Sequence, residues 1–217
     1  MNWLAEGSTY ILSTIAALLP IVNPLSAVGL VASITVNLTE AERIDQIRRA
    51  CIYMFFILAA FLVAGGLIMS FFGISIPGLR IAGGMIVSYL GFRMLFPDTA
   101  AISNQEQVEA LHKADISFTP LAMPSLSGPG SIAVVIGIST AAQESDRIVA
   151  HYVFVAVGIA ITAVISYAVL KAASRLDKLL GATGMNAMAR IMGFLLICMG
   201  IQFVINGVLG VVESAGP

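Results

Sequence analysis

Charged residues are scarce in this sequence: they make up 11% of its 217 residues, whereas hydrophobic residues make up 59% and the mean hydropathy is +0.97. Soluble globular domains carry about 25% charged residues, so this composition excludes that class. The apolar residues fall in long runs, and runs of about 20 apolar residues are typical of transmembrane helices. The chain is therefore predicted to be an all-α integral membrane protein.

Acidic side chains are missing from the middle of every long apolar run. A carboxylate at membrane depth is a frequent proton carrier in transporters, so its absence argues against a simple proton relay there. An ion coupled to transport would then be Na⁺ held by carbonyl and hydroxyl oxygens, or H⁺ bound by groups near the membrane faces.

Signals for other ligands and for export are also missing. The two cysteines, Cys51 and Cys198, form no CxxC pair, so we expect them to pack as small apolar side chains, with no metal and no cofactor. No tract of basic residues suggests a nucleic-acid partner. Residues 1–7 contain no lysine or arginine, so we expect the first apolar run to be a retained helix rather than a secretory signal.

Six runs have the length of a membrane-spanning helix: 8–36, 46–72, 75–96, 117–142, 148–171 and 187–211. Before the second run, Thr39-Glu40-Ala41-Glu42 is typical of a capping box that opens a helix. Residues 98–116 form the one substantial polar linker. We expect it to be cytoplasmic and to divide the chain into two three-helix units, residues 1–97 and 117–217.

Lysine and arginine are unevenly distributed between the two sets of loops. The odd-numbered loops and their flanks hold eight of them, whereas the opposite side holds Arg80 and Arg147. Basic residues favour the cytoplasmic side, so both termini are predicted to face the periplasm. The cytoplasmic set is Arg43, Arg48, Arg49, Arg93, Lys113, Lys171, Arg175 and Lys178.

The two halves resemble each other. A shift of 104 residues places Pro20 on Pro124 and the segment 40–44 on 144–148. Because each half has three spans, the second half must be upside down relative to the first. This is an inverted-topology repeat, the usual plan of secondary transporters.

Two spans, the first and the fourth, are interrupted near their middles by proline, glycine and polar residues, at 20–26 and at 124–131. A break at membrane depth leaves backbone groups without partners, and it is tolerated only where it is buried in protein or lines a cavity. A pair of breaks at corresponding positions is a pointer to a transporter's substrate site. We expect new helices to start near the midplane, after each break, with their N-termini converging on one cavity.

The breaks offer groups that suit a zwitterion. Free N–H groups of residues 25–27 and 130–132 would bind a carboxylate, since helix N-termini are partly positive. The unwound carbonyls of residues 20–22, with polar side chains, would accept hydrogen bonds from an ammonium. Neither break contains a bulky or charged side chain, which favours a small substrate that is neutral overall. The candidate substrate-binding residues are Pro20, Ile21, Val22, Asn23, Pro24, Leu25, Ser26, Ser125, Ser127, Gly128, Pro129, Gly130 and Ser131.

The sequence resembles the MarC family of bacterial inner-membrane proteins over almost its whole length. The resemblance is carried by the segment 20–24, by Leu-Thr-Glu-Ala-Glu-Arg at 38–43, by Ile-Ala-Gly-Gly at 81–84 and by the segment 124–130. It implies six helices and an inner-membrane location. It also relates the chain to SnatA-type transporters of small neutral amino acids such as glycine and alanine, with the substrate held by the two broken segments.

Three classes of function remain open at this point. A transporter of small neutral amino acids by alternating access leads. A channel for small neutral solutes is the alternative, since Asn23-Pro24 is similar to the half-helix starts of aquaporins. A serine hydrolase using His151 is disfavoured, because no GxSxG motif surrounds the serines of the second break, so we predict no enzyme activity.

Two further points stay open. Arg80 and Arg190 suit helix ends that reach the membrane interface, or gates. Besides lipids and the substrate, a second copy of the chain is a partner that the sequence leaves open.

Overall fold

The computed structural model describes residues 3–35, 37–96, 115–143 and 147–215, so most of the expected linker 98–116 lies outside the described residues. Every element in this part of the chain is helical, as predicted. In chain order the elements are α1 (Trp3–Val22), α2 (Pro24–Ile34), α3 (Glu40–Phe72), α4 (Ile76–Leu95), η1 (Ser117–Leu126), α6 (Pro129–Gln143), α7 (Ile148–Lys171) and α8 (Ala173–Ala215).

The first interruption is a single residue. Asn23 has φ 44° and ψ 62°, the left-handed conformation, which asparagine adopts more readily than most residues. Pro24 follows at the first position of α2, where its missing N–H is tolerated. The expected unwinding of residues 20–22 is wrong, because α1 stays helical through Val22 and the Asn23 N–H still donates to the Leu19 carbonyl at 3.0 Å.

The second interruption is longer and more irregular. Element η1 has π-helical bonds, from Leu121 N–H to the Ile116 carbonyl at 3.3 Å and from Ser127 N–H to the Ala122 carbonyl at 2.8 Å. Thr119 and Met123, each just before a proline, have extended backbone angles within it. The helix α6 restarts at Pro129, and its axis is bent by 62° from that of η1.

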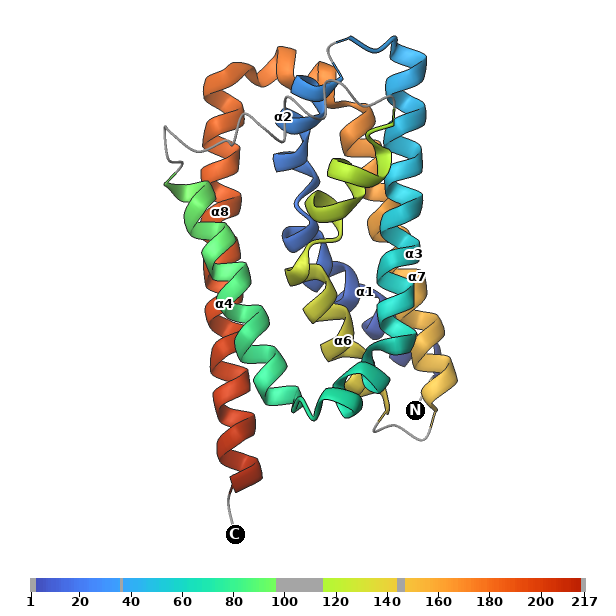
Figure 1. The fold of residues 1–217 in the computed structure, drawn as a ribbon, viewed down its shortest axis with the longest axis vertical. Coiled ribbons are helices and arrows are strands. Elements are labelled where there is room, and N and C mark those ends of the chain that lie inside the picture. The colour runs from blue at the N-terminus through green and yellow to red at the C-terminus, as the bar shows by residue number, and fades with distance from the viewer. Residues whose placement is uncertain (1–2, 36, 97–114, 144–146, 216–217) are drawn as a thin grey trace.

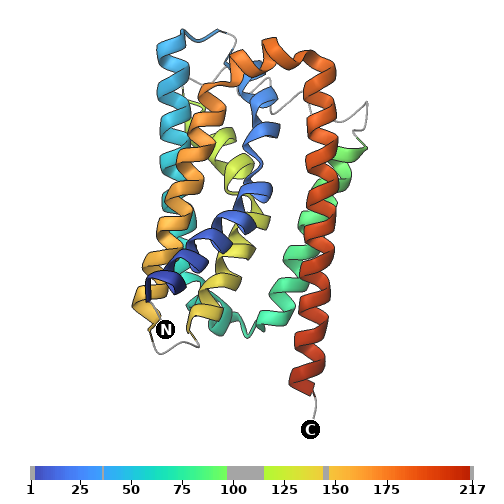
Figure 2. The ribbon, with the colours of Figure 1, turned by 180° about the vertical axis from the view of Figure 1, so that it is seen from behind.

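The elements form two packed groups, which we call the bundle and the arm. The bundle contains α1, α2, α3, η1, α6 and α7 around a core that includes Met54, Leu58, Leu121 and Ile159. The arm contains α4 and the part of α8 that follows Gly181, and these two helices pack mainly against each other. Figures 1 and 2 show the arm beside the bundle, with α4 and α8 antiparallel.

Glycine allows the arm helices to approach closely. A Cβ on Gly91 would lie 2.6 Å from the Gly193 carbonyl oxygen, and one on Gly193 would lie 2.8 Å from that of Gly91. Gly84 and Gly200 face each other in the same reciprocal way. Small residues at such contacts are typical of membrane helix pairs.

The helix ends follow their capping residues. Thr39 and Glu42 form the predicted capping box at the start of α3, with the Thr39 N–H donating to Glu42 Oε2 at 2.9 Å. Gly73, at φ 63°, ends α3, and Ser75 caps α4 through its hydroxyl. These contacts fix the turn between α3 and the arm.

The outer surface is apolar, as a lipid-facing surface must be. Phe56, Val63 and Leu67 on α3 are each more than 60% exposed. By length and composition, four segments can cross a membrane: Gly7–Ala32, Glu40–Phe72, Ile148–Lys171 and Thr183–Ser214. A fifth is added if the bent pair of η1 and α6 is one span. The structure thus supports four or five spans; α4 is not among them, and the count of six stays a prediction.

Candidate functional site

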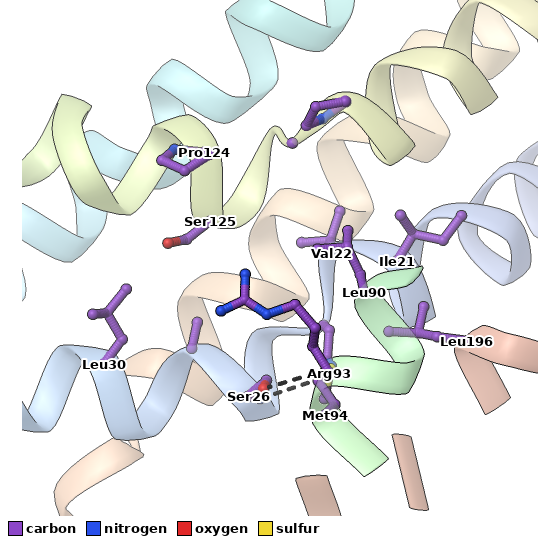
Figure 3. Close-up of a pocket in the computed structure, with 14 residues that line it drawn as sticks. Ile21, Val22, Ser26, Leu30, Leu90, Arg93, Met94, Pro124, Ser125 and Leu196 are labelled. Carbon is purple, nitrogen blue, oxygen red and sulfur yellow. Dashed lines mark hydrogen bonds between the residues drawn. The ribbon is translucent and has the colours of Figure 1, made fainter. Parts of the chain in front are cut away.

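The two helix breaks face each other across a cavity of about 460 Å³, which we call the central pocket. It lies between the bundle and the arm, and Figure 3 shows the side chains that surround it. Its residues come from both breaks, from α4 and from α8: Ile21, Val22, Asn23, Ser26, Ala27, Leu30, Leu90, Arg93, Met94, Pro124, Ser125, Gly128, Pro129 and Leu196.

Asn23 is the polar centre of the first break. It is buried, and its side-chain oxygen accepts a hydrogen bond from the Ser26 N–H at 3.3 Å. The Asn23 carbonyl accepts from Ser26 N–H and Ala27 N–H at 3.1 and 3.3 Å. The expectation that these N–H groups are free is therefore wrong, because the left-handed Asn23 turns back to cap its own helix.

The remaining polar atoms of Asn23 and Ser26 meet a weak partner. Asn23 Nδ2 lies 3.4 Å from the sulfur of Met94, and Ser26 Oγ lies 4.0 Å from the same atom (Figure 3). A thioether is a poor hydrogen-bond acceptor. Both donors would therefore form a stronger hydrogen bond with an oxygen atom of a ligand in the pocket.

The second break contributes fewer ligand-facing groups than its sequence suggested. Ser125, Gly128 and Pro129 line the pocket, and Figure 3 shows the Ser125 side chain on the wall formed by the second break. Gly130 is buried instead against Val87 and Ile21, where a Cβ would lie 2.9 and 3.1 Å from their side-chain carbons. The N–H of Ile132 is also not free, since it donates to the Gly128 carbonyl at 3.1 Å.

Ser127 and Ser131 lie behind the pocket rather than on its wall. Both are buried, and Ser131 Oγ donates to the Leu126 carbonyl at 3.4 Å. The Ser127 hydroxyl is fully buried and has no hydrogen-bond partner among the described residues. Of the thirteen candidate residues, Pro20, Pro24, Leu25, Ser127, Gly130 and Ser131 do not line the cavity.

Arg93 is the main functional candidate that the sequence did not reveal. It belongs to the last turn of α4, and Figure 3 shows its guanidinium extending between Ser125 and Ser26. Neither break contains a charged side chain, so the charge of the pocket comes from α4. In the sequence, Arg93 is one of eight basic residues assigned to the cytoplasmic side. The pattern of α4 gave no sign of which face meets the breaks, because glycine and apolar residues occur all around that helix.

The pocket thus combines a fixed positive charge with neutral polar groups in apolar walls. Leu30, Leu90, Leu196 and Ile21 form those walls. Among the described residues, no group of three metal-ligating side chains is present. The arrangement can hold a small molecule that carries a carboxylate.

Comparisons with known proteins agree with the membrane character of the chain. The model of the MarC family of integral membrane proteins matches residues 8–212. The chain is 43% identical, over 208 residues, to the inner membrane protein MarC of Escherichia coli strain K12, covering 92% of this chain and 94% of that protein. The MarC protein of Shigella flexneri gives the same identity and coverage. No solved structure matches the chain.

These relatives and the long apolar helices together place the protein in the inner membrane, with several membrane passes. The side on which its termini lie stays a prediction. The chain belongs to the MarC family of integral membrane proteins.

Proposed function

We propose that this protein is a secondary transporter, not an enzyme, that moves small neutral amino acids such as glycine and alanine across the inner membrane by alternating access. The substrate would occupy the central pocket. The observation that carries this proposal is the position of Arg93, whose guanidinium reaches a cavity bounded by two broken helices. An amino acid supplies a carboxylate, which a guanidinium can bind through two parallel hydrogen bonds.

The polar groups around Arg93 suit both ends of a zwitterion. Arginine binds a carboxylate through two parallel hydrogen bonds, and Asn23 Nδ2 is a second donor that now meets only a thioether. The Ser125 hydroxyl, with two lone pairs, can accept from the ammonium. The leucine and isoleucine side chains add no charge or polar group to the pocket, which suits an amino acid with a neutral, apolar side chain such as alanine.

The helix arrangement supports an inverted repeat of residues 1–97 and 117–217. The helices after the two breaks, α2 and α6, run in opposite directions (Figure 1). The second helices of the two proposed halves, α3 and α7, pack against each other, and the third helices, α4 and α8, do the same. This pairing of equivalent elements is what a two-fold axis in the membrane plane would produce.

A channel for small neutral solutes is the alternative, and one contact favours the transporter over it. A channel needs a continuous path, whereas Gly130, Val87 and Ile21 meet in a buried contact beside the pocket. A closed contact next to a binding pocket suits alternating access.

Uptake of labelled glycine, alanine and leucine into proteoliposomes tests the proposal, with imposed Na⁺ or H⁺ gradients to identify a coupling ion. We expect saturable uptake of glycine and alanine, weak uptake of leucine, and loss of uptake in Asn23→Ala. The matched control is Arg190→Gln, which removes a charge from the arm but touches neither break. Rapid, unsaturable flux that ignores both gradients would support the channel instead, and no movement of any amino acid would reject the proposal.

A further inference from the structure

A second cavity, of about 370 Å³, lies between the same bundle and arm on the side toward the two chain termini. We call it the second pocket. Its polar residues are Tyr10, Ser13, Arg80 and Asn206. We propose that the second pocket is a binding site for the same carboxylate-bearing substrate, reached from the opposite membrane face, with Arg80 as its anion-binding group. This inference rests on the proposed function.

The two pockets follow one another along the same helices. On α4, Arg80 and Gly83 line the second pocket, whereas Leu90 and Arg93 line the central one. On α1 the order along the chain is the same, with Ser13 and Ala17 of the second pocket before Ile21 of the central one. On α6 and α8, which run in the opposite direction, the order is reversed: Pro129 and Leu196 of the central pocket precede Ala133 and Phe203 of the second one. Four elements thus line both cavities, which makes them two ends of one route.

A narrow contact, which we call the waist, separates the cavities. It consists of Ile21, Val87 and Gly130, all buried. Just beside it, a Cβ on Gly83 would lie 2.8 Å from that of Ala133, so α4 and α6 touch closely here as well. The arm therefore meets the bundle at its middle and leaves a cavity on each side.

Arg80 lines the second pocket and forms no ion pair with another described residue, as an anion-binding group requires. No carboxylate among the described residues lies within ion-pair distance of it, unlike Arg48 and Arg49, which pair with Asp45. Gln202 donates to Asn206 Oδ1 at 2.9 Å, which leaves the Asn206 NH₂ group as a second donor. Arg80 and Arg93 are 13 positions apart on α4, or about 20 Å at a rise of ~1.5 Å per residue. That separation covers much of a hydrocarbon core of about 30 Å.

Sided labelling of introduced cysteines tests the proposal. In a background with Cys51→Ala and Cys198→Ala, Ser13→Cys reports on the second pocket and Ser125→Cys on the central one. Each is treated with a membrane-impermeant thiosulfonate in vesicles of either orientation. We expect the two cysteines to react from opposite faces, and saturating glycine to slow both reactions.

Arg80→Gln provides the second arm of the test. We expect it to raise, by about tenfold or more, the glycine concentration that protects Ser13→Cys, since a charged hydrogen-bonded pair is lost. Arg80→Lys should restore part of this protection, and the control Arg190→Gln should leave it unchanged. Labelling of both cysteines from one face would overturn the second site. Protection of Ser125→Cys alone would also overturn it while leaving the proposed function intact, whereas protection of neither would reject both.

Discussion

Among single residues, Asn23 and Arg93 matter most for the proposed substrate binding. The sequence predicts a place in the site for Asn23 but not for Arg93. Asn23 stands out because asparagine before proline interrupts an apolar run, and the structure places it at the break. Arg93 looks like an ordinary basic residue at a helix end, where charge normally reaches the interface. Only the packing of α4 against the two breaks brings it into the pocket.

Two substitutions of Asn23 separate its structural role from its proposed binding role. Asn23→Ala loses the cap and places a Cβ in a left-handed conformation, so we expect a loss of about 1–2 kcal/mol in stability. Asn23→Gly keeps that conformation at little strain and should cost only about a few tenths of a kcal/mol. Thermal unfolding in detergent measures both. Glycine uptake should be lost in both variants, and normal uptake in Asn23→Gly would contradict a role for the amide.

At the scale of the element, both breaks were predictable as interruptions, but their chemistry was not. Proline and glycine marked where the helices stop, whereas the hydrogen bonds that close the breaks depend on local backbone geometry. The N–H groups of Ser26 and Ala27 donate to Asn23, and that of Ile132 donates to the Gly128 carbonyl, so these three of the six expected N–H groups are not free. The close contacts of the arm glycines, in contrast, follow from residue size alone, since glycine lets the backbones of two helices approach.

The arm can be tested through one of those glycines. A Cβ on Gly200 would meet Ser88 and the backbone of Gly84, so Gly200→Ala should destabilise the protein by about 1–3 kcal/mol. Gly29→Ala is the matched control, since nothing lies within 4 Å of its Cβ position, and it should be neutral or stabilising by up to about 1 kcal/mol. Unfolding midpoints compare the two; equal midpoints would contradict the tight packing of α4 on α8.

The start of η1 makes a prediction about pH. Hydrogen bonds from the Ser117 side chain and N–H hold the pKa of Asp115 below its ordinary value of 3.8. A lowered pKa means that this carboxylate stabilises the folded state above that value and loses its effect as pH falls through the folded-state pKa. We expect Asp115→Ala to have a lower unfolding midpoint than wild type at pH 7, by a small amount because the group is exposed. The difference should disappear in strong acid, and a difference that persists there would contradict the assignment.

At the scale of the whole molecule, the arm and the bundle meet at the waist and enclose a cavity on each side of it. Both described connections of the arm to the bundle contain a glycine with positive φ: Gly73 at 63° and Gly181 at 60°. Figures 1 and 2 show Gly181's region as the bend where α8 turns from one end of the molecule down its side. These glycines set the direction in which the arm leaves the bundle, and composition alone indicated neither this division nor the second pocket.

Gly181 should tolerate substitution less well than Gly73. Its ψ of 178° lies in a region that is essentially restricted to glycine, where a side chain costs about 1–3 kcal/mol. Gly73 has a ψ of 27° and an ordinary left-handed conformation, which asparagine can adopt. We expect Gly181→Asn to lower both the unfolding midpoint and the rate of glycine uptake, and Gly73→Asn to change them little. Equal effects of the two substitutions would contradict this difference in backbone strain.

The central claim is that Arg93 holds the carboxylate of a small amino acid between the two breaks. Isothermal titration of glycine into the full-length protein in lipid nanodiscs tests it most directly, with wild type, Arg93→Gln, Arg93→Lys and the control Arg190→Gln. We expect Arg93→Gln to weaken glycine binding by about tenfold or more, Arg93→Lys to have an intermediate affinity, and Arg190→Gln to bind as wild type does. Glycine binding of wild-type strength in Arg93→Gln would contradict it.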